Sequence, residues 1–308
     1  MSNKAPLNVN FMAPRKILGV MSIILVVGSL ILLGTRGLNL GMDFTGGTTV
    51  VVQGEQDIDT DQVREALSGN GFGDAVVQYY GSAREVSIRV SPREDADADK
   101  VGHQVFDLIA GQIGNISLLK VEFVGPQVGD ELRDQSGLAL LMALGLMLVY
   151  VWFRFTNKFA VSTVSALIHD VIITLGLFSL LQWPFDLTVL AAVLALIGYS
   201  LNDSIVVADR IRENFRNSRE TDPTAIINGA INETLSRTIN TSFTTMLVLV
   251  ALFLFGGEVM RAFSEALLVG IFIGTYSSIY VVANLLFTFK VSKDDFLVAT
   301  KEEVDDMP

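Results

Sequence analysis

The sequence predicts an α-helical polytopic membrane protein with six transmembrane helices and one ferredoxin-like α+β domain outside the membrane. Half of its 308 residues are hydrophobic, and its mean hydropathy is +0.48. Several apolar stretches reach the roughly 18 residues that indicate a membrane-spanning helix. One long polar segment interrupts them after the first stretch, and its pattern alternates between strand and helix.

Polar breaks divide the apolar sequence into six candidate spans, near 16–34, 137–155, 159–182, 185–211, 238–256 and 263–289. We therefore expect an N-terminal segment over 1–15, a first transmembrane helix over 16–34, an external domain over 35–136, helices two to six over 137–289 and a C-terminal tail over 290–308. The first span follows basic residues, as the core of a signal peptide does. Because this core is long and no small-residue cleavage site follows it, we expect an uncleaved anchor.

Positive charges predict the orientation of these spans. Lys and Arg cluster before span one, between spans two and three, and after span four. Short loops rich in these residues stay in the cytoplasm. We therefore expect both termini in the cytoplasm. The external domain and the turn 182–186, which carries Trp183 and no cation, lie on the opposite side of the membrane.

The external segment has the order of a ferredoxin-like domain. Strand patterns at 48–52, 75–80, 86–90 and 118–124 alternate with helical patterns at 60–68 and 97–113, which gives β-α-β-β-α-β. This fold hosts many functions, so it does not by itself indicate one. Asp and Glu outnumber Lys and Arg in this segment, which gives no electrostatic reason to expect nucleic-acid binding. The chain has no cysteine, which excludes disulfides and thiolate metal sites.

A glycine-rich run, Gly41 to Thr48, joins span one to the first strand of the domain. It has neither the glycine spacing of a dinucleotide-binding loop nor that of a P-loop, and it does not open a helix. Its local chemistry predicts a turn that leads into the strand.

Asp203 lies in the apolar run 196–207 of span four. A charge at the centre of a membrane helix costs about 2.5–3.5 kcal/mol, so a carboxylate there indicates a function. Arg237 stands near the start of span five, and Asn240 or Thr241 and Thr244 continue a polar stripe from it. The stripe is able to face span four or to hold water. The competing interpretation is a permanent ion pair that only fixes helix packing, or an Arg237 that snorkels to the interface.

His169 and Asp170 lie near the middle of span three. Histidine titrates near neutral pH, so the pair is suited to a proton relay. A buried hydrogen-bonded pair that supports the bundle is an equal alternative. In span six, Gly270, Gly274 and Ser278 recur every four residues, which permits close approach of another helix.

Three stretches resemble motifs of the SecF family: Gly41 to Thr48, Gly198 to Val207, and Asp209 to Asn214. The resemblance continues at Glu233 to Thr238 with Thr241 and Ser242, and at Phe255 to Gly257. It covers nearly the whole chain. In that family SecF pairs with SecD, and the pair resembles a transporter of the resistance-nodulation-division superfamily. The resemblance therefore implies that the six spans form half of such a membrane domain.

The resemblance implies which residues act. The family's proton-transport carboxylate and arginine correspond to Asp203 and Arg237, and Asn202 lies beside the carboxylate in the same motif. To this relay set we add His169 and Asp170 from their position in span three. The family motif at the entry to the periplasmic domain corresponds to Gly41, Asp43, Phe44, Gly46 and Gly47.

The resemblance also implies partners and a location. The family works in the bacterial inner membrane and uses proton flow to assist protein export through the SecY channel. The implied partners are SecD, the SecY/SecE/SecG channel, the translocating preprotein and membrane lipid, with YajC and YidC as further candidates. Whether H⁺ or Na⁺ drives the process does not follow from a lone buried carboxylate.

Two other function classes compete with this one. A noncatalytic scaffold would dock translocase partners through the external domain, and its buried charges would only hold the bundle together. An intramembrane protease would need Asp170 and Asp203 to converge, but Asp203 follows Ser-Leu-Asn rather than the expected Gly-x-Gly. The chain has no P-loop, nucleophile triad or metal-binding motif, so we expect no enzyme and no cofactor.

Overall fold

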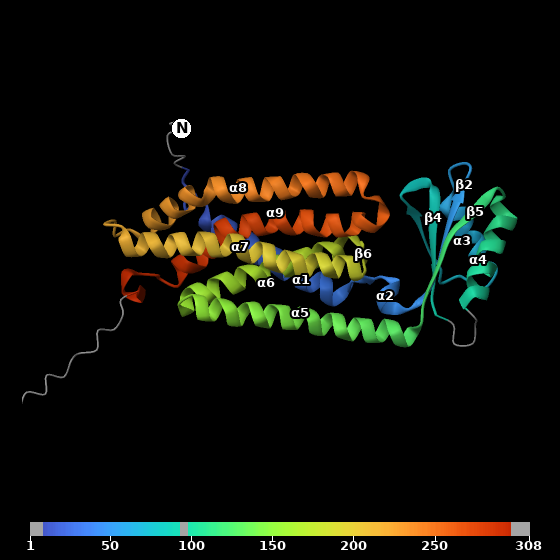
Figure 1. Cartoon of the computed structure of the whole chain (residues 1–308), viewed down its shortest axis with the longest axis horizontal. Helices are drawn as coiled ribbons and strands as arrows, with labels where there is room; N and C mark the ends of the chain where they lie inside the picture. Colours follow the sequence, from blue (N-terminus) through green and yellow to red (C-terminus); the bar gives the residue numbers. More distant parts are fainter. Residues whose placement is uncertain (1–8, 93–97, 297–308) are drawn as a thin grey trace, which may run out of the picture.

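The computed structural model describes residues 9–92 and 98–296 and shows an elongated molecule (Figure 1). A helical bundle occupies one end, and a small sheet domain projects from the other. The start of helix α1 and the 3-10 turn η1 (Lys293–Phe296) both lie at the end of the bundle far from the sheet domain. Most of the predicted N-terminal segment and of the predicted tail lies outside the described residues.

Six helices within the described part of the chain are long and apolar enough to cross a membrane. They are α1 (Arg15–Thr35), α5 (Pro126–Arg154), α6 (Asn157–Leu181), α7 (Leu187–Asn217), α8 (Pro223–Phe255) and α9 (Gly257–Thr288). The predicted fold class of six apolar helices with one small sheet domain is thus confirmed. Helices α6, α7 and α9 form the centre of the bundle, and α1, α5 and α8 bury a much smaller share of their residues.

Three helices extend well beyond the predicted spans. Helix α5 begins at Pro126 and so includes the last eleven residues of the predicted external segment 35–136. Helix α7 continues to Asn217 and α8 already begins at Pro223, so a connection of five residues replaces the long loop that polar composition suggested. The reason is burial, because Ile227 and Ile231 lie one turn apart and enter the hydrophobic core. The Asp222 side chain accepts a hydrogen bond from the Thr224 amide and caps the new helix start.

The small residues of α9 pack against α7 within the same chain. A Cβ atom on Gly270 would lie 2.5 Å from a Leu196 side-chain carbon, and one on Gly274 would contact Ser200 and Asp170. Glycine at position 270 therefore lets the helices approach closely, whereas a methyl group at position 274 would make ordinary van der Waals contacts. The four-residue spacing of small residues in α9 therefore allows helix packing inside this chain.

The sheet domain has the predicted β-α-β-β-α-β order. It consists of β2 (Gly47–Gly54), α3 (Thr60–Ser68), β3 (Val76–Tyr80), β4 (Ser82–Val90), α4 (Ala98–Ile113) and β5 (Ile116–Val124). The sheet order is β3-β4-β2-β5 with every pair antiparallel. The core joins alternate strand residues to the apolar faces of α3 and α4, including Val50, Ile88, Val63, Leu67 and Val105.

A compact junction links this domain to the bundle. Strand β1 (Asn39–Leu40) pairs in parallel with β6 (Pro184–Phe185), and the short helix α2 (Met42–Thr45) follows β1. Gly46 and Gly47 then adopt φ angles of 68° and 124°, which disfavour any side chain. A Cβ atom on Gly46 would lie 3.0 Å from the Cα atom of Pro126, where the chain leaves the domain for α5.

Candidate functional site

Asp203 is buried in the bundle at 3% exposure and is only loosely held. Its two carboxylate oxygens accept hydrogen bonds from Thr241 and Ser242 of α8, each at a donor–acceptor distance of 3.5 Å. These distances are long for O–H···O bonds, which centre near 2.7–2.8 Å. Both hydroxyls also have nearer partners: Thr241 lies 2.9 Å from the Thr238 carbonyl, and Ser242 lies 2.7 Å from the Thr275 hydroxyl. The Asp203 carboxylate therefore lacks a strong hydrogen-bond donor among the described residues.

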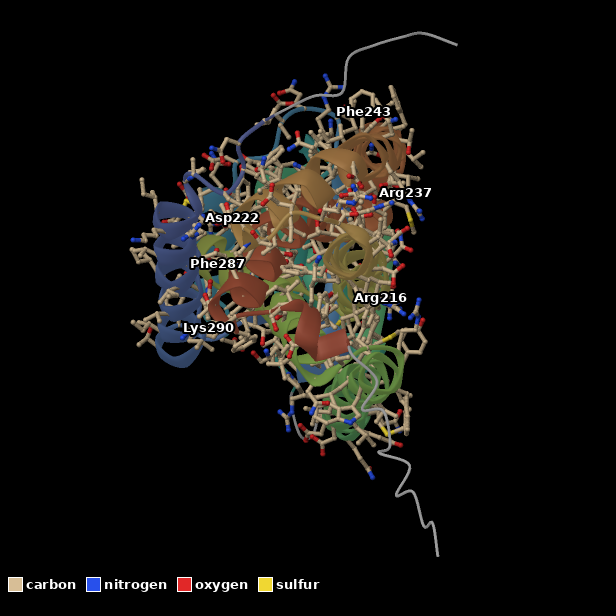
Figure 2. The ribbon with its side chains drawn as sticks, turned by 90° about the vertical axis from the view of Figure 1, so that its left-hand side faces the viewer. Arg216, Asp222, Arg237, Phe243, Phe287 and Lys290 are labelled. Carbon is tan, nitrogen blue, oxygen red and sulfur yellow. The ribbon has the colours of Figure 1, made fainter. Side chains whose placement is uncertain are left out.

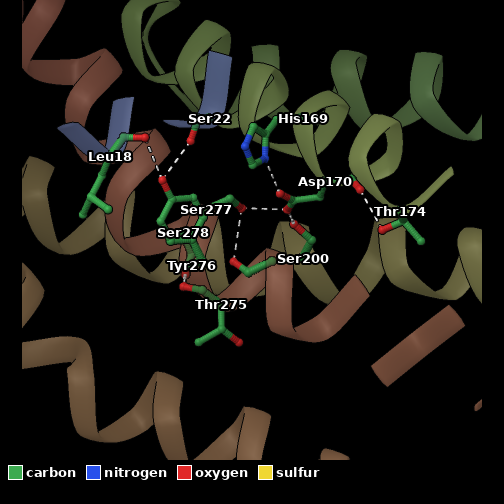
Figure 3. Close-up of polar contacts among 11 residues, drawn as sticks. Leu18, Ser22, His169, Asp170, Thr174, Ser200, Thr275, Tyr276, Ser277 and Ser278 are labelled. Atoms are coloured by element: carbon green, nitrogen blue, oxygen red, sulfur yellow. Dashed lines mark hydrogen bonds and ion pairs between the residues drawn. The ribbon is translucent and has the colours of Figure 1, made fainter. Parts of the chain in front are cut away.

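Asp170 is fully buried and tightly held (Figure 3). One carboxylate oxygen lies 2.8 Å from Nδ1 of His169. The other accepts hydrogen bonds from the hydroxyls of Ser200, at 2.5 Å, and Ser277, at 2.7 Å. These donors come from α6, α7 and α9, so Asp170 ties the three central helices together.

The sequence predicted both carboxylates but not the hydroxyl groups around Asp170. Ser200 lies one turn before Asp203 on α7, and Ser277 lies beside Thr275 on α9. The available signal was the polar run Thr275-Tyr276-Ser277-Ser278 inside an apolar span, next to Gly274. Buried hydroxyls in a membrane helix need partners, which makes such a run a candidate for a polar contact between helices.

The structure brings His169 and Asp170 together but leaves Arg237 and Asn202 on the surface of the bundle. Residues 202 and 237 are exposed, and no ion pair within 4 Å joins the described side chains of Arg237 and Asp203. In the end-on view, Arg237 lies on the side of the bundle opposite α1 (Figure 2). The anticipated contact between Arg237 and Asp203 is thus not made within this chain.

Their heights along the bundle nevertheless match. Asp203 lies fourteen residues before the end of α7 at Asn217, and Arg237 lies fourteen residues after the start of α8 at Pro223. At 1.5 Å per residue, both distances are about 21 Å. Because the two helices run antiparallel and Thr241 contacts Asp203, the arginine backbone lies about one turn from the level of the carboxylate.

The glycine-rich motif forms the junction between the domain and the bundle. The Asp43 carboxylate accepts a hydrogen bond from the Leu187 amide at 3.0 Å, at the first residue of α7. Phe44 is buried against Phe185 with ring centroids 5.9 Å apart. The Gly41 amide donates to the Phe185 carbonyl at 2.7 Å. The motif therefore fixes the start of α7 to the entry of the sheet domain.

Arg89 of β4 completes this junction from the domain side. Its guanidinium donates a hydrogen bond to the Leu40 carbonyl at 2.8 Å. Burial lowers the pKa of Arg89 from its usual value, and the nearby carboxylates of Asp186 and Asp43 act in the opposite direction. This cation therefore links β4 of the sheet to β1 of the junction, and no sequence motif marks it.

The two buried carboxylates are held separately in the bundle. Asp170 and Asp203 share no hydrogen-bond partner among the described residues, so they do not form the paired site that an aspartyl protease needs. Residues 9–92 and 98–296 contain no group of three or more His, Cys, Asp or Glu side chains able to hold a metal.

Comparison with known proteins identifies the family. The profile of the family described as "Protein export membrane protein SecD/SecF, C-terminal" matches residues 105–292, and the "SecD/SecF GG Motif" profile matches residues 31–58. A protein translocase subunit SecF of Vibrio alginolyticus is 46% identical over 99% of this chain and 98% of its own length. The chain belongs to the SecF family. A second SecF, from Pseudomonas aeruginosa, is 47% identical over 97% of this chain and 98% of its own length.

A solved structure agrees with this assignment. SecDF of Thermus thermophilus, described as a translocon-associated membrane protein, superposes with a TM-score of 0.83 at 39% identity. The match covers 92% of this chain but 39% of that longer chain, so this SecF-family protein spans about two fifths of SecDF. The resistance-nodulation-division-like membrane architecture that the sequence predicted is thereby confirmed, as is membership of a SecD/SecF-type system.

Proposed function

We propose that this chain uses the proton motive force, together with SecD, to assist late steps of protein translocation through the SecY channel. The observation that carries the proposal is the state of Asp203: a carboxylate in the middle of a membrane bundle, held by two long hydroxyl contacts. An ionisable group at this depth is costly, and it is retained where an ion moves. Its weak contacts leave it free to change partner.

The proposed switch uses the charge of Asp203. The ionised carboxylate attracts the Arg237 guanidinium, which comes from the neighbouring helix at a similar depth. A proton that binds Asp203 removes the charge, so this attraction ends and α8 is free to shift against α7. Each proton charge that crosses the full potential supplies about 2.3 kcal/mol per 100 mV. Asn202, His169 and Asp170 complete the proposed relay set.

The junction offers a route from this switch to the sheet domain. Helix α7 carries Asp203, and its first residue, Leu187, is bonded to Asp43 in the glycine-rich motif. A movement of α7 therefore displaces the point at which the sheet domain is attached. We propose that this movement changes how the sheet domain holds the translocating preprotein.

The proposed orientation places both termini in the cytoplasm of a bacterium and the sheet domain in the periplasm. It is supported by Arg and Lys side chains at the end of the bundle far from the sheet domain, including Arg15, Lys16, Arg154 and Lys158. The inner membrane is then the site of action. The SecY/SecE/SecG channel is the proposed working partner, and YajC and YidC are proposed as accessory partners.

A noncatalytic scaffold is the second candidate, and the contacts of Asp170 favour it. This carboxylate has three short hydrogen-bond contacts, as expected for a group that only holds helices together. Under this alternative the chain docks SecD and the channel without moving ions. The two functions differ in whether Asp203 has to bind and release a proton.

Export into inverted membrane vesicles tests the proposal. A preprotein is first moved part of the way with ATP, the ATP is then removed, and completion is measured with and without a proton gradient. We expect Asp203→Asn to abolish the gradient-dependent completion while SecD still copurifies. Asp134→Asn, the same change on an exposed carboxylate of α5, serves as the control. Normal completion by Asp203→Asn would replace the proposal with the scaffold.

A further inference from the structure

A second polar route lies on the other side of the bundle from Arg237. A crevice of about 640 Å³ runs between α1 and α9. Its lining includes Lys16 and Thr288, at the end of the bundle far from the sheet domain, and reaches His169 near the middle of α6. None of the contacts of Asp203 involves this crevice.

One wall of the crevice carries a continuous polar stripe. Tyr276, Tyr280, Asn284 and Thr288 all line it and recur every four residues on α9. Side chains at this spacing lie above one another on one face of a helix. At 1.5 Å per residue, the stripe is about 18 Å long. It therefore connects the end of the bundle with the level of His169, through walls that are otherwise mostly apolar.

His169 stands at the inner end of the stripe with one ring nitrogen unpaired. The side chain is 6% exposed, and its Nδ1 contacts Asp170. Its Nε2 has no hydrogen-bond partner among the described residues. Figure 3 shows the ring between Asp170 on one side and the α1 ribbon on the other, with the second nitrogen away from Asp170. A buried polar atom without a partner costs about 1–3 kcal/mol, so this nitrogen requires a hydrogen-bonding occupant of the crevice.

The neighbouring hydroxyl does not supply that partner. The Tyr276 hydroxyl donates to the Leu18 carbonyl at 2.9 Å and contacts the Ser22 hydroxyl at 2.9 Å. The titratable groups that face the crevice are His169 itself, Tyr276 and Tyr280 of α9, and Lys16 at the mouth, while Asp170 lies behind the imidazole. A lipid chain in the crevice would leave the His169 Nε2 atom without a hydrogen bond, whereas water supplies one.

We propose that the crevice is a hydrated path through which the His169–Asp170 pair exchanges protons with the cytoplasm. In the resting pair, Nδ1–H donates to the Asp170 carboxylate and Nε2 accepts a hydrogen bond from water. A proton delivered by that water binds Nε2, and the resulting imidazolium is balanced by the adjacent carboxylate. Release to water reverses the step. The role of this path in driving export rests on the proposed ion-driven function. The crevice and its polar stripe are features of the structure and do not depend on that proposal.

Isotope labelling tests proton exchange directly, because the chain contains two histidines. His103→Gln on the exposed face of α4 leaves His169 as the single imidazole. In lipid vesicles that contain the complex with SecD, we expect the ¹⁵N signal of Nε2 to change when the buffer pH is varied across the range of about 5 to 8, where histidine in general changes charge. A signal that stays constant over this range would overturn proton exchange at His169.

Cysteine labelling tests the water path, because the chain has no native cysteine. Tyr280→Cys in the crevice is compared with Ile24→Cys, which is 65% exposed on α1 and does not line the crevice. The two positions lie eight and nine residues from the ends of their helices, about 12–14 Å. A charged, membrane-impermeant thiosulfonate is added at the cytoplasmic face. We expect at least tenfold faster labelling at position 280, whereas equally slow rates would show a dry or lipid-filled crevice and overturn the path.

A second substitution asks whether water follows the stripe. Asn284→Leu has a similar size but removes the amide between Tyr280 and the mouth of the crevice. In the Tyr280→Cys chain we expect it to slow labelling at least threefold, with Ile24→Cys unaffected and SecD still bound. An unchanged rate at position 280 would contradict a path along α9. These labelling rates do not depend on export. If Asp203→Asn completes export normally, the proposed function fails, but the labelling rates still test the water path.

Discussion

Asp203 and Asp170 are both buried carboxylates, but they differ in the strength of the bonds that hold them. Asp170 has three contacts between 2.5 and 2.8 Å, and Asp203 has two at 3.5 Å. A carboxylate with short bonds from three helices resists displacement. One with long bonds changes partner at little cost, which suits a group that alternates between charge states.

This difference predicts the stability of two variants. Asp170→Ala removes the acceptor of the Ser200 hydroxyl and of the His169 imidazole, and each buried group left without a partner costs about 1–3 kcal/mol. The Ser277 hydroxyl keeps the Gly274 carbonyl as acceptor at 3.1 Å. We expect Asp170→Ala to lower the free energy of unfolding by several kcal/mol, and Asp203→Asn to lower it by less than about 1 kcal/mol. Unfolding of the detergent-solubilised protein by increasing SDS measures both. Equal losses would show that Asp203 is as firmly held as Asp170.

At the residue scale, the sequence predicts which groups are unusual but not which groups they contact. A charge inside an apolar run is visible directly, so Asp203, Asp170 and His169 were identified. Their partners depend on how several helices rotate about their axes. Ser200, Ser277 and Ser242 are ordinary residues in a membrane helix, and only the packed bundle makes them hydrogen-bond donors to a carboxylate. Arg237 was identified by the same rule, yet the bundle turns it outward.

At the scale of elements, glycines in the central helices differ in what surrounds them. A Cβ atom on Gly270 of α9 would lie 2.5 Å from Leu196, whereas one on Gly198 of α7 would meet nothing within 4 Å. We expect Gly270→Ala to destabilise the bundle by about 1–3 kcal/mol through overpacking. Gly198→Ala, its matched control, should be neutral or stabilising by up to about 1 kcal/mol, because alanine favours helix. Thermal unfolding in detergent compares the two, and an equal shift would show that α9 and α7 are less closely packed.

The 3-10 turn η1 after α9 is docked by an ion pair that predicts a pH dependence. Asp295 contacts the Lys158 ammonium at 2.7 Å and the Ser292 amide at 2.8 Å. Burial raises the pKa of Asp295, but the bonds from Lys158 and Ser292 lower it, and the net pKa lies below the usual value. Because its pKa is lower in the folded protein, ionised Asp295 stabilises the docked turn at pH values above the unfolded pKa of about 3.9. This stabilisation is lost as the pH falls through the folded pKa.

We therefore expect η1 to remain docked at neutral pH and to detach below about pH 4. The contribution is about 0.5–1 kcal/mol, since both side chains are partly exposed. A spin label at position 293, an exposed residue of η1, reports detachment as increased mobility on acidification. In the Asp295→Asn variant, the spin label should be equally mobile at every pH. A label that stays immobile at low pH in the unsubstituted turn would contradict the role of this ion pair.

The ends of the elements were the least predictable feature of the fold. The approximate limits of the strands followed from hydrophobic patterns, but α5 begins at Pro126, eleven residues before the predicted start of its span. The extension of α8 back to Pro223 did not, because residues 223–236 mix polar and apolar side chains and only their burial against the bundle favours helix. The thickness of the membrane sets the minimum length of a spanning helix. Packing outside the membrane decides at which residue the helix begins.

At the scale of the whole molecule, one side of the bundle is incomplete. Four polar residues of α7 and α8 are exposed: Asn202, Arg237, Asn240 and Thr244. Arg237 lies on the side of the bundle opposite α1 (Figure 2). Such groups avoid lipid and face protein or water. SecDF, of which this chain covers 39%, contains further chain that could cover this side. We expect SecD to pack there.

Cross-linking tests this arrangement. Asn240→Cys should cross-link to SecD through a bifunctional thiol reagent that also reacts with a cysteine placed in the SecD membrane helices. Ile24→Cys on α1 should give at least tenfold less product, since α1 lies on the other side of the bundle. Equal yields from the two positions, or a higher yield from α1, would place SecD elsewhere and leave the exposed Arg237 to another partner.

The two covalent connections of the sheet domain meet at one place, because Gly46 on the way in lies against Pro126 and Gly129 on the way out. A body attached at a single place can rotate without stretching either connection. Strand β2 begins there and has eight residues, about 26 Å at 3.3 Å per residue. A tilt of about 20° would carry its far end by about 9 Å while the attachment stays nearly still. The junction thus converts ångström-scale shifts of a helix end into a displacement as large as two to three residues of extended chain.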